Sequence, residues 1–453
     1  MKKNKIVESI KNILIIVLIV YAIYQFFDMY TNVSLSDIFT SWVTKDEESS
    51  DFYFMPQETM ISFGDKEFVK INEGTLQEEL VNDYIKEIYD LIFKTKHSFD
   101  EVEANIVSIM NERSIILCYD DYDYEMTEEL FGISNDRILR SINKIEKIVI
   151  RPTASEGEKG ICFVYGNDKA IMFELNIDTT ELYGLIDEIN LFETMNIYLL
   201  SENYDYRNHF KKEIFIPAAI IDNDMFNRNE NITMNMPFDN DEEALDNYIN
   251  TFFINPNAKW KMEKEQDVLL YGDGERTLTV YKEGFFNYTY TNVSNESITL
   301  NDAIKIANEK ISKDLYLSDR IKLSNVRKVN DNTYELSYDY YINNSKITIA
   351  NAIKNKYKIK YPITFVISGG DIINIKALII NINEEILDEE EIVNNKTYNI
   401  ISYDNILNKM ITDFPDLLFT SLKIGYFKSS MNQNPTLKWI METDKEIYTF
   451  DIQ

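Results

Sequence analysis

One uncharged, almost wholly apolar segment near the N-terminus constrains how the rest of the chain can fold. Residues 12–27 read NILIIVLIVYAIYQFF and carry no charged side chain. As a helix rising about 1.5 Å per residue, this segment spans about 24 Å, somewhat less than the roughly 30 Å of a bilayer's hydrocarbon core. Lys11 can extend its side chain to the interface, and Met29 and Tyr30 continue the apolar surface. We therefore expect one membrane-spanning helix over residues 12–30.

The charges that flank this helix predict its orientation. Lysines precede it at Lys2, Lys3, Lys5 and Lys11. Acidic residues follow it, so the positive-inside rule places residues 1–11 in the cytoplasm and the bulk of the chain outside. The apolar side chains of the anchor are Ile13, Leu14, Ile15, Ile16, Val17, Leu18, Ile19, Val20 and Ile23. We expect a single-pass protein of the cell membrane whose N-terminus is cytoplasmic.

The anchor is expected to persist in the mature protein. A signal peptide ends in small residues at its cleavage site, but the exit of this segment reads YAIYQFF. A lipoprotein needs a cysteine here, and the first cysteine of the chain is Cys118. Residues 13–23 contain no pair of small residues four apart, so close helix packing of the GxxxG type is not predicted.

Composition narrows the class of protein. The 453 residues exceed what one hydrophobic core supports and suggest about three domains. Apolar residues make up 45% of the chain, which favours well-packed domains over disorder. The formal net charge of −30 creates a field that repels nucleic acid, so we expect no nucleic-acid partner.

Hydrophobic periodicity predicts an α+β ectodomain of antiparallel sheets packed with helices. After a linker over residues 31–50, a first domain is expected over 51–236. A capping box at 75–78 opens one helix, and 98–101 is expected to open a second. Strand patterns follow at 114–119, 145–151, 161–166, 169–176 and 196–200, with a helix at 179–190 before the last of them.

The remainder of the chain repeats one arrangement, a helix followed by several strands. Helices are expected at 242–253, 300–312 and 403–412, each before a group of strands. This predicts a middle domain over 237–392 and a C-terminal domain over 393–453, although the segment 300–392 fits with either. Within the strands, Gly369 and Gly370 are typical of a hairpin turn.

Residues that carry chemistry are few. The two histidines, His97 and His209, lack metal-ligand spacing, and motifs for nucleophilic or phosphate-binding loops are absent from the sequence. We therefore expect no catalytic residue, no cofactor and no metal site. Cys118 and Cys162 each lie in an apolar strand pattern, where burial as small hydrophobic side chains is favoured over a disulfide.

Acidic residues suggest one candidate cation site, and a second match to a calcium loop fails. Asp121, Asp123 and Glu125 alternate with tyrosines, as in an exposed strand with an acidic face. Asp222 and Asp224 resemble the start of a calcium loop, but no Glu closes that loop. A hydrolase with two carboxylates brought together only by the fold stays open as an alternative.

Short motifs near the C-terminus resemble those of the YycH family. They are the run LKIGY at 422–426, the run NPTLKWI at 434–440 and the run YTF at 448–450, which are similar to the family's closing strands. The run FFINP at 252–256 resembles the start of the family's middle domain. The single anchor and the layout of the domains extend the resemblance over nearly the whole length.

The resemblance implies a function. Proteins of the YycH family are membrane-anchored extracytoplasmic proteins of Gram-positive bacteria that regulate the WalK (YycG) sensor histidine kinase of a two-component system for cell-wall homeostasis. The resemblance implies three extracytoplasmic domains, no enzymatic activity, and association with that kinase and with a YycI-like bitopic protein. The alternative is a membrane-tethered module that binds an envelope ligand, either a peptide or a glycan.

Overall fold

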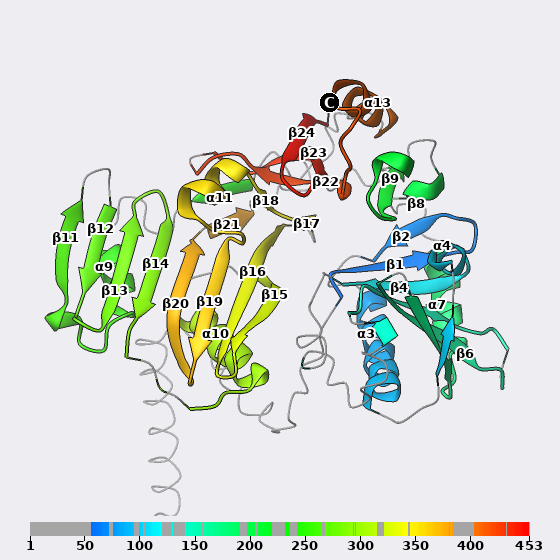
Figure 1. Ribbon diagram of the computed structural model, residues 1–453, viewed down its shortest axis with the longest axis horizontal. Helices are drawn as coiled ribbons and strands as arrows, with labels where there is room; N and C mark the ends of the chain where they lie inside the picture. Colours follow the sequence, from blue (N-terminus) through cyan, green and yellow to red (C-terminus); the bar gives the residue numbers. More distant parts are fainter. Residues whose placement is uncertain are drawn as a thin grey trace, which may run out of the picture. The chain divides into compact units, whose positions relative to one another are not determined.

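The computed structural model describes most of the chain after residue 55. It covers residues 56–452, apart from residues 72–75, 95–98, 103–104, 120–128, 130–140, 143, 156, 168, 191–196, 204–206, 220–231, 236–241, 265–267, 293, 295, 315–320, 343–344, 380, 385–402 and 432. Tyr53–Gln453 form one compact unit. Large antiparallel sheets alternate with helices, so the α+β fold expected from the sequence is confirmed (Figure 1). The domain boundaries expected near 236 and 392 stay predictions.

The first sheet, here called the N-terminal sheet, contains nine of the described strands. Their order is β3 (Asp100–Val102), β7 (Lys169–Leu175), β6 (Gly160–Gly166), β5 (Lys147–Arg151), β4 (Ser114–Cys118), β1 (Glu58–Ser62), β2 (Phe68–Lys70), β8 (Ile197–Leu200) and β9 (Phe215–Ala219). Every neighbouring pair is antiparallel. The strand patterns found in the sequence between 114 and 200 therefore correspond to real strands.

Helices cover the N-terminal sheet. The short helix α4 (Ile106–Met110) packs on one face, where it joins a core that contains Met60, Ile116 and Phe163. The longer helices are α3 (Leu76–Tyr89), which continues as the π-turn η1 (Asp90–Lys94), and α7 (Thr180–Asn190). These two helices contact each other.

The two cysteines lie on opposite faces of this sheet. Cys118 packs against the core around α4, while Cys162 occupies the alternate face of its own strand, next to Phe163. Successive side chains of a strand point to opposite faces, so the sheet separates the two thiols. Both are free cysteines, and burial raises the pKa of the Cys118 thiol to about 12.

One sequence prediction in this region is wrong. Residues 98–101 were expected to open a helix, but Asp100–Val102 form the edge strand β3 against β7. The helix begins later, at Ile106, because the Asn105 side chain caps it by accepting a 3.0 Å hydrogen bond from the backbone N–H of Val107. The acidic residues at 100 and 101 lie on the strand instead.

The second sheet, the middle sheet, also contains nine of the strands that the structure describes. Their order is β11 (Trp260–Lys264), β12 (Val268–Gly272), β13 (Arg276–Tyr281), β14 (Phe285–Tyr290), β20 (Asp371–Leu378), β19 (Ile363–Ser368), β16 (Thr333–Ile342) and β15 (Ile321–Asn330), with β17 (Ser345–Lys346) beside β16. Strand β14 pairs with β20, so segments 260–290 and 321–378 share one sheet.

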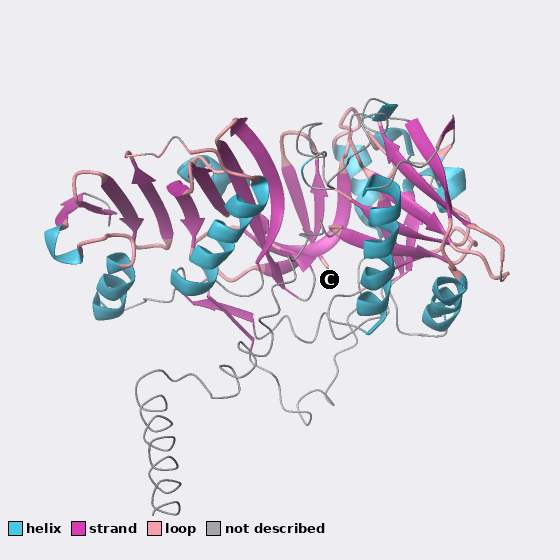
Figure 2. Ribbon diagram, turned by 90° about the horizontal axis from the view of Figure 1, so that it is seen from below, coloured by secondary structure: helices cyan, strands magenta, loops and turns pink. Residues whose placement is uncertain are grey.

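Helices α9 (Glu242–Asn250) and α10 (Leu300–Asp314) lie on the same side of the middle sheet (Figure 2). The tyrosines of β16 that alternate in the sequence lie in this core, and Tyr338 donates a 3.1 Å hydrogen bond from its hydroxyl to Asn308 of α10. A further short helix, α11 (Asn351–Tyr357), precedes β19 in the chain. Gly369 and Gly370 form the predicted two-residue hairpin turn, with φ of +56° and +86°.

The third sheet, the C-terminal sheet, contains four strands in the described part of the chain. Strands β22 (Ser421–Lys428), β23 (Thr436–Glu442) and β24 (Ile447–Asp451) form an antiparallel meander, preceded by α13 (Tyr403–Asp413). The fourth strand, β18 (Thr348–Ile349), comes from the middle segment and pairs parallel to β22. A separate two-stranded pair joins β10 (Ile232–Asn235) to β21 (Asn381–Glu384).

Candidate interaction site

The residues proposed from sequence as functional lie largely outside the described part of the chain. This holds for the anchor residues from Ile13 to Ile23, for the lysines from Lys2 to Lys11, for the candidate cation site at 121–125 and for the failed calcium-loop match at 222–224. Among the residues that the structure describes, no helix has the length and apolar character to cross a membrane. Within the same residues, no group of three or more His, Cys, Asp or Glu side chains is placed to hold a metal ion.

The C-terminal sheet forms backbone hydrogen bonds with segments that adjoin both other sheets. On the side of the middle sheet, β18 pairs with the end of β22, and Ala350 donates its backbone N–H to the carbonyl of Lys428 at 3.0 Å. On the side of the N-terminal sheet, Phe210 and Phe419 form a parallel bridge, and the N–H of Lys211 donates to the Phe419 carbonyl at 2.9 Å. Sequence reasoning missed these contacts because they join residues far apart in the chain.

Side chains reinforce the same contacts. The rings of Phe210 and Phe419 lie 6.2 Å apart between centroids. Lys211 forms an ion pair with Asp444, and the Asn351 side chain donates to the carbonyl of Lys445 at 3.2 Å. The C-terminal sheet is therefore one element that connects the first and middle segments. These segments also meet directly, because Glu129 pairs with Lys328 at 3.0 Å and accepts a 2.8 Å hydrogen bond from the Tyr334 hydroxyl.

A group of charged side chains lies beside this connection. Lys423 of β22 and Glu442 of β23 form a 3.1 Å ion pair. Burial alone would raise the pKa of Glu442, but Lys423, helped by Lys346 and Lys354, lowers it. Lys346 also pairs with Asp339, a carboxylate that is almost fully buried in β16.

The group extends to the N-terminal sheet. Glu58 of β1 and Lys70 of β2 form a 2.9 Å ion pair, and Lys423 contributes to lowering the pKa of Glu58. Desolvation, and then the charge of Lys70, lowers the pKa of Lys322 on β15 to about 8. Charged side chains of all three sheets therefore affect one another's pKa values.

One lysine of the C-terminal sheet is nearly fully buried. Lys428 is 2% exposed, and its Nζ donates hydrogen bonds to the backbone carbonyls of Met431 at 3.1 Å and Gln433 at 2.5 Å. Burial lowers the pKa of this amine to about 8. The carbonyls satisfy the donor, and they close the loop that leads from β22 to β23.

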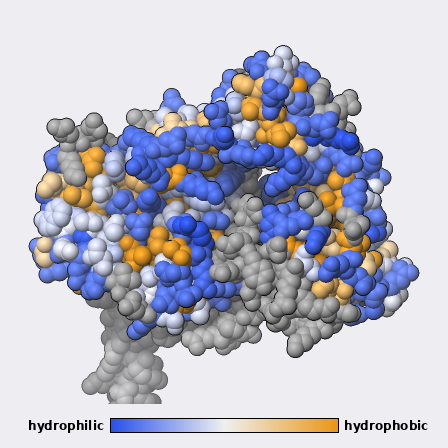
Figure 3. Space-filling view, in the orientation of Figure 1, coloured by the Kyte–Doolittle hydropathy of each residue, from blue (hydrophilic) through white to orange (hydrophobic). Residues whose placement is uncertain are grey.

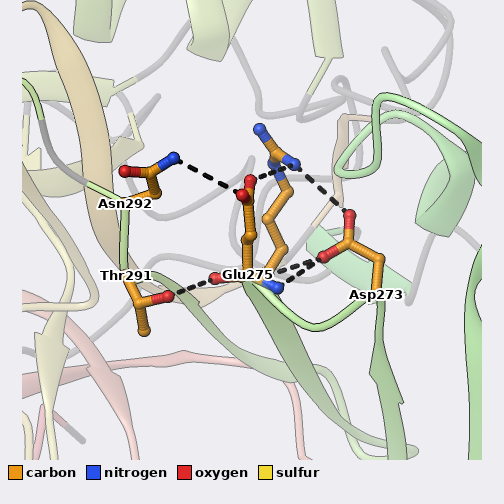
Figure 4. A network of polar contacts seen from close by, with 5 residues as sticks. Asp273, Glu275, Thr291 and Asn292 are labelled. Carbon is orange, nitrogen blue, oxygen red and sulfur yellow. Dashed lines mark hydrogen bonds and ion pairs between the residues drawn. The ribbon is translucent and has the colours of Figure 1, made fainter.

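An ion pair between the half-buried side chains of Asp273 and Arg276 stabilises a turn of the middle sheet (Figure 4). Asp273 accepts hydrogen bonds from the backbone N–H groups of Glu275 and Arg276, at 3.1 and 2.8 Å, and its other oxygen pairs with the Arg276 guanidinium at 3.3 Å. The guanidinium also lies 4.5 Å from the Tyr290 ring centre. Thr291 donates a 3.0 Å hydrogen bond to the carbonyl of Glu275. All of these contacts are internal to one hairpin and its neighbour, so we interpret the group as structural.

Exposed large apolar side chains mark surfaces suited to a protein partner. In the described residues they are Ile254, Trp260, Met262, Val329, Phe414 and Leu418. Trp260 and Met262 lie on β11, and Phe414 and Leu418 lie between α13 and β22. Figure 3 shows apolar residues gathered on the visible side of the C-terminal sheet, near α13. Aromatic and long aliphatic side chains anchor protein interfaces, so these positions are the candidate contact sites of the described ectodomain.

Comparison with known proteins identifies the fold. No family model and no curated protein sequence matches the chain. Among solved structures, the crystal structure of YycH from Bacillus subtilis matches with a TM-score of 0.53 and 12% sequence identity, over 88% of this chain and 95% of that chain. The chain therefore shares the fold of YycH over nearly its whole length.

Proposed function

We propose that this chain is a non-enzymatic, extracytoplasmic regulator of a membrane sensor histidine kinase of the WalK (YycG) type. The observation that carries the proposal is the YycH fold, which matches over 88% of the chain. The sequence resemblance supports it independently, because the runs at 422–426 and 434–440 that resemble the YycH family fall on β22 and β23. The kinase belongs to a two-component system that controls cell-wall homeostasis.

The proposal includes a single membrane anchor. The apolar run at 12–27 supports a spanning helix, and Lys2, Lys3, Lys5 and Lys11 support a cytoplasmic N-terminus. A bitopic protein of this kind can act on a kinase laterally, through helix packing in the bilayer and through contacts outside it. Such contacts regulate the kinase if they bind one of its conformations more tightly than the other.

The proposal also includes a second partner, a bitopic protein similar to YycI. The segment between α13 and β22 is suited to such contacts, because it exposes Phe414 and Leu418 to solvent. No catalytic, cofactor-binding or metal-binding residue is part of the proposed function.

The test is an exchange of the anchor. Residues 12–27 are replaced by an unrelated apolar helix of the same length, with the flanking lysines kept so that the orientation is unchanged. If the anchor contacts the kinase, the exchange abolishes regulation, measured as the phosphorylation of the kinase in membranes. Protease resistance of the ectodomain serves as the folding control.

Unchanged regulation after the exchange would contradict the role of the anchor. Binding of purified peptidoglycan fragments by the full-length protein, with no change in kinase phosphorylation when the gene is deleted, would instead favour the envelope-ligand alternative. The two outcomes are distinguishable because the first concerns the kinase and the second concerns a ligand.

A further inference from the structure

Most sheet edges in the described ectodomain are protected against pairing with another strand. An edge strand presents unpaired backbone N–H and C=O groups, and natural proteins protect it by shortness, charge, proline or cover. Edge β3 has three residues, two of them acidic, and edge β9 contains Pro217 and contacts β22 and α13. Edge β18 has two residues.

The edges of the middle sheet are protected by charge. Strand β11 carries the exposed residues Lys261 and Glu263 between its apolar positions. Strand β15 carries Lys322, Arg327 and Lys328 along its length. Lysine and arginine on an edge disfavour the approach of a second strand, because their charges would have to be desolvated.

Strand β24 differs from all of these edges. It reads Ile447-Tyr448-Thr449-Phe450-Asp451, and the first four side chains are half-buried. It pairs with β23 on one side, and no described strand pairs with its other side. Tyr448 contacts the ring of the exposed residue Phe414 at 5.0 Å between centroids, so the apolar surface continues from the strand onto the segment after α13.

We propose that β24 is a dimerisation edge, at which a second copy of this chain adds its own β24 in the antiparallel direction. This inference does not depend on the proposed kinase. In the proposed register, Thr449 of one copy lies opposite Thr449 of the other. Ile447 then lies opposite Asp451, and Tyr448 lies opposite Phe450, so that all five residues of each strand are paired. The interface is then isologous, with the same surface contributed by both copies.

The residues of β24 are self-complementary in this register. Tyr448 and Phe450 lie on the face that α13 covers, since they contact Phe414 and Lys409. Each Tyr448 lies opposite a Phe450 of the second copy, which gives two aromatic cross-strand pairs on that face. On the other face the two Thr449 side chains lie opposite each other, and such threonine pairs are favourable.

Charges at the two ends of the strand are complementary as well. Asp451 is largely exposed and forms an ion pair with Lys438 of its own chain. In the dimer it lies opposite Ile447 of the second copy, two positions along from the exposed Lys445 in the turn before that strand. Because the pairing is two-fold, this opposite-charge contact occurs twice. The net charge of −30 on each chain opposes association only weakly at physiological salt, where the Debye length is about 8 Å.

The register predicts one cross-link. Cα atoms of opposed residues in an antiparallel pair are about 4.5–5.5 Å apart, within the span of a disulfide. In the full-length protein in membranes, Thr449→Cys should give a dimer on mild oxidation, several times more than Tyr448→Cys or Phe450→Cys. The native cysteines do not interfere, because Cys162 is buried and the pKa of the Cys118 thiol is raised.

A matched control examines β11, the edge of the middle sheet that carries Lys261 and Glu263. Met262→Cys places a thiol on β11, where the side chain is 52% exposed, and should give no dimer. A dimer from Met262→Cys but not from Thr449→Cys would overturn the proposal, as would a cross-link from Thr449→Cys only to a different protein. A monomer from Thr449→Cys, with hydrogen exchange in β22 and β23 unchanged, would overturn it too.

A second pair of variants tests the same edge without a thiol. Thr449→Lys places two like charges opposite each other at the two-fold axis, so it should convert the dimer to monomer in sedimentation of the detergent-solubilised full chain. Thr449→Val keeps the strand uncharged and should leave the dimer intact. Monomer for both the wild type and Thr449→Val, or dimer for Thr449→Lys, would contradict the proposal.

Discussion

The middle sheet and the C-terminal sheet are both built from strands preceded by a helix, yet they differ in how they complete themselves. The middle sheet takes its strands from the continuous stretch 260–378, and its core face is covered by α9 and α10. The C-terminal sheet takes β18 from the middle segment and bonds to Phe210 of the first segment. The larger sheet is self-contained, whereas the smaller one depends on its neighbours and exposes an unprotected edge. We therefore expect the middle sheet to depend less on its neighbours for its stability than the C-terminal sheet does.

The largest effect expected is from matched core truncations in the two sheets. Phe365 and Trp439 are both buried, at 0% and 1% exposure. Replacement of such an aromatic residue by alanine typically costs about 3–5 kcal/mol. Phe365→Ala should lower the stability of the whole ectodomain, measured by urea unfolding. Trp439→Ala should additionally increase hydrogen exchange in β18 and near Phe210. If hydrogen exchange in Trp439→Ala increased only in β22–β24, the C-terminal sheet would not be coupled to its neighbours, and the comparison of the two sheets would fail.

A smaller effect is expected at the hairpin that joins β19 to β20 in the middle sheet. A Cβ at Gly369 would lie 2.1 Å from the Ser294 carbonyl oxygen, and φ at this residue is +56°. Gly369→Ala should therefore cost about 3 kcal/mol, from the left-handed backbone and the contact with Ser294 together. Gly370 has φ of +86° with open space around it, so Gly370→Ala should cost only about 1 kcal/mol. Thermal unfolding of the two variants measures the difference, and equal costs would contradict this account.

The buried amine of Lys428 predicts a pH dependence that belongs to the C-terminal sheet. Its pKa falls from 10.5 to about 8 on folding, because burial disfavours the charged form. Between these values the unfolded chain binds more protons, so this group makes the free energy of unfolding rise as the pH rises from about 8 to about 10.5, by up to about 3 kcal/mol. Lys428→Met should remove that rise.

Lys322 provides the comparison for this measurement. Its pKa is also lowered to about 8, but this side chain belongs to β15 of the middle sheet. Urea unfolding is measured at pH 7.5 and pH 10.5 for the wild type, Lys428→Met and Lys322→Met. The free energy of unfolding should rise less between these pH values in each variant than in the wild type. A pH dependence that is unchanged in Lys428→Met would show that the amine is not desolvated in the folded protein.

The smallest effect concerns the ion pair between Lys211 and Asp444. Both side chains are substantially exposed, at 39% and 56%. Exposed pairs contribute about 0–1 kcal/mol, so Lys211→Ala should change global stability by less than about 1 kcal/mol. A double-mutant cycle with Asp444→Ala measures the coupling. A coupling well above 1 kcal/mol would mean that this contact, rather than the backbone bridge, joins the two segments.

Much of the secondary structure could be predicted because it depends on local periodicity. The alternation of Tyr334, Leu336, Tyr338 and Tyr340 identified β16 and its buried face, and all four are buried. The Gly369-Gly370 pair identified a hairpin, since both residues adopt positive φ. Helix α11 was missed because it ends at Lys358 in a left-handed conformation with φ of +52°, without the glycine that usually marks a helix end.

The candidate interaction site could not be predicted from the sequence. Strand β18 has only two residues, and its partner Phe427 lies about eighty residues along the chain, so no local pattern indicates the pairing. The aromatic residues of β24 resemble those of a buried strand, and only the order of strands in the sheet shows that β24 is an edge. The charged residues of β11 likewise concealed a strand in a segment that the sequence left unassigned.

The central claim, that the chain acts on a sensor kinase through contacts in and above the membrane, is tested most directly by cross-linking in intact membranes. Photoreactive residues are placed at Ile16 in the proposed anchor and at Phe414 in the segment between α13 and β22, with Glu174 on β7 as a control position. The account predicts that a histidine kinase or a second bitopic protein is captured from the first two positions and not from Glu174. Capture of neither protein from Ile16 or Phe414 would contradict it.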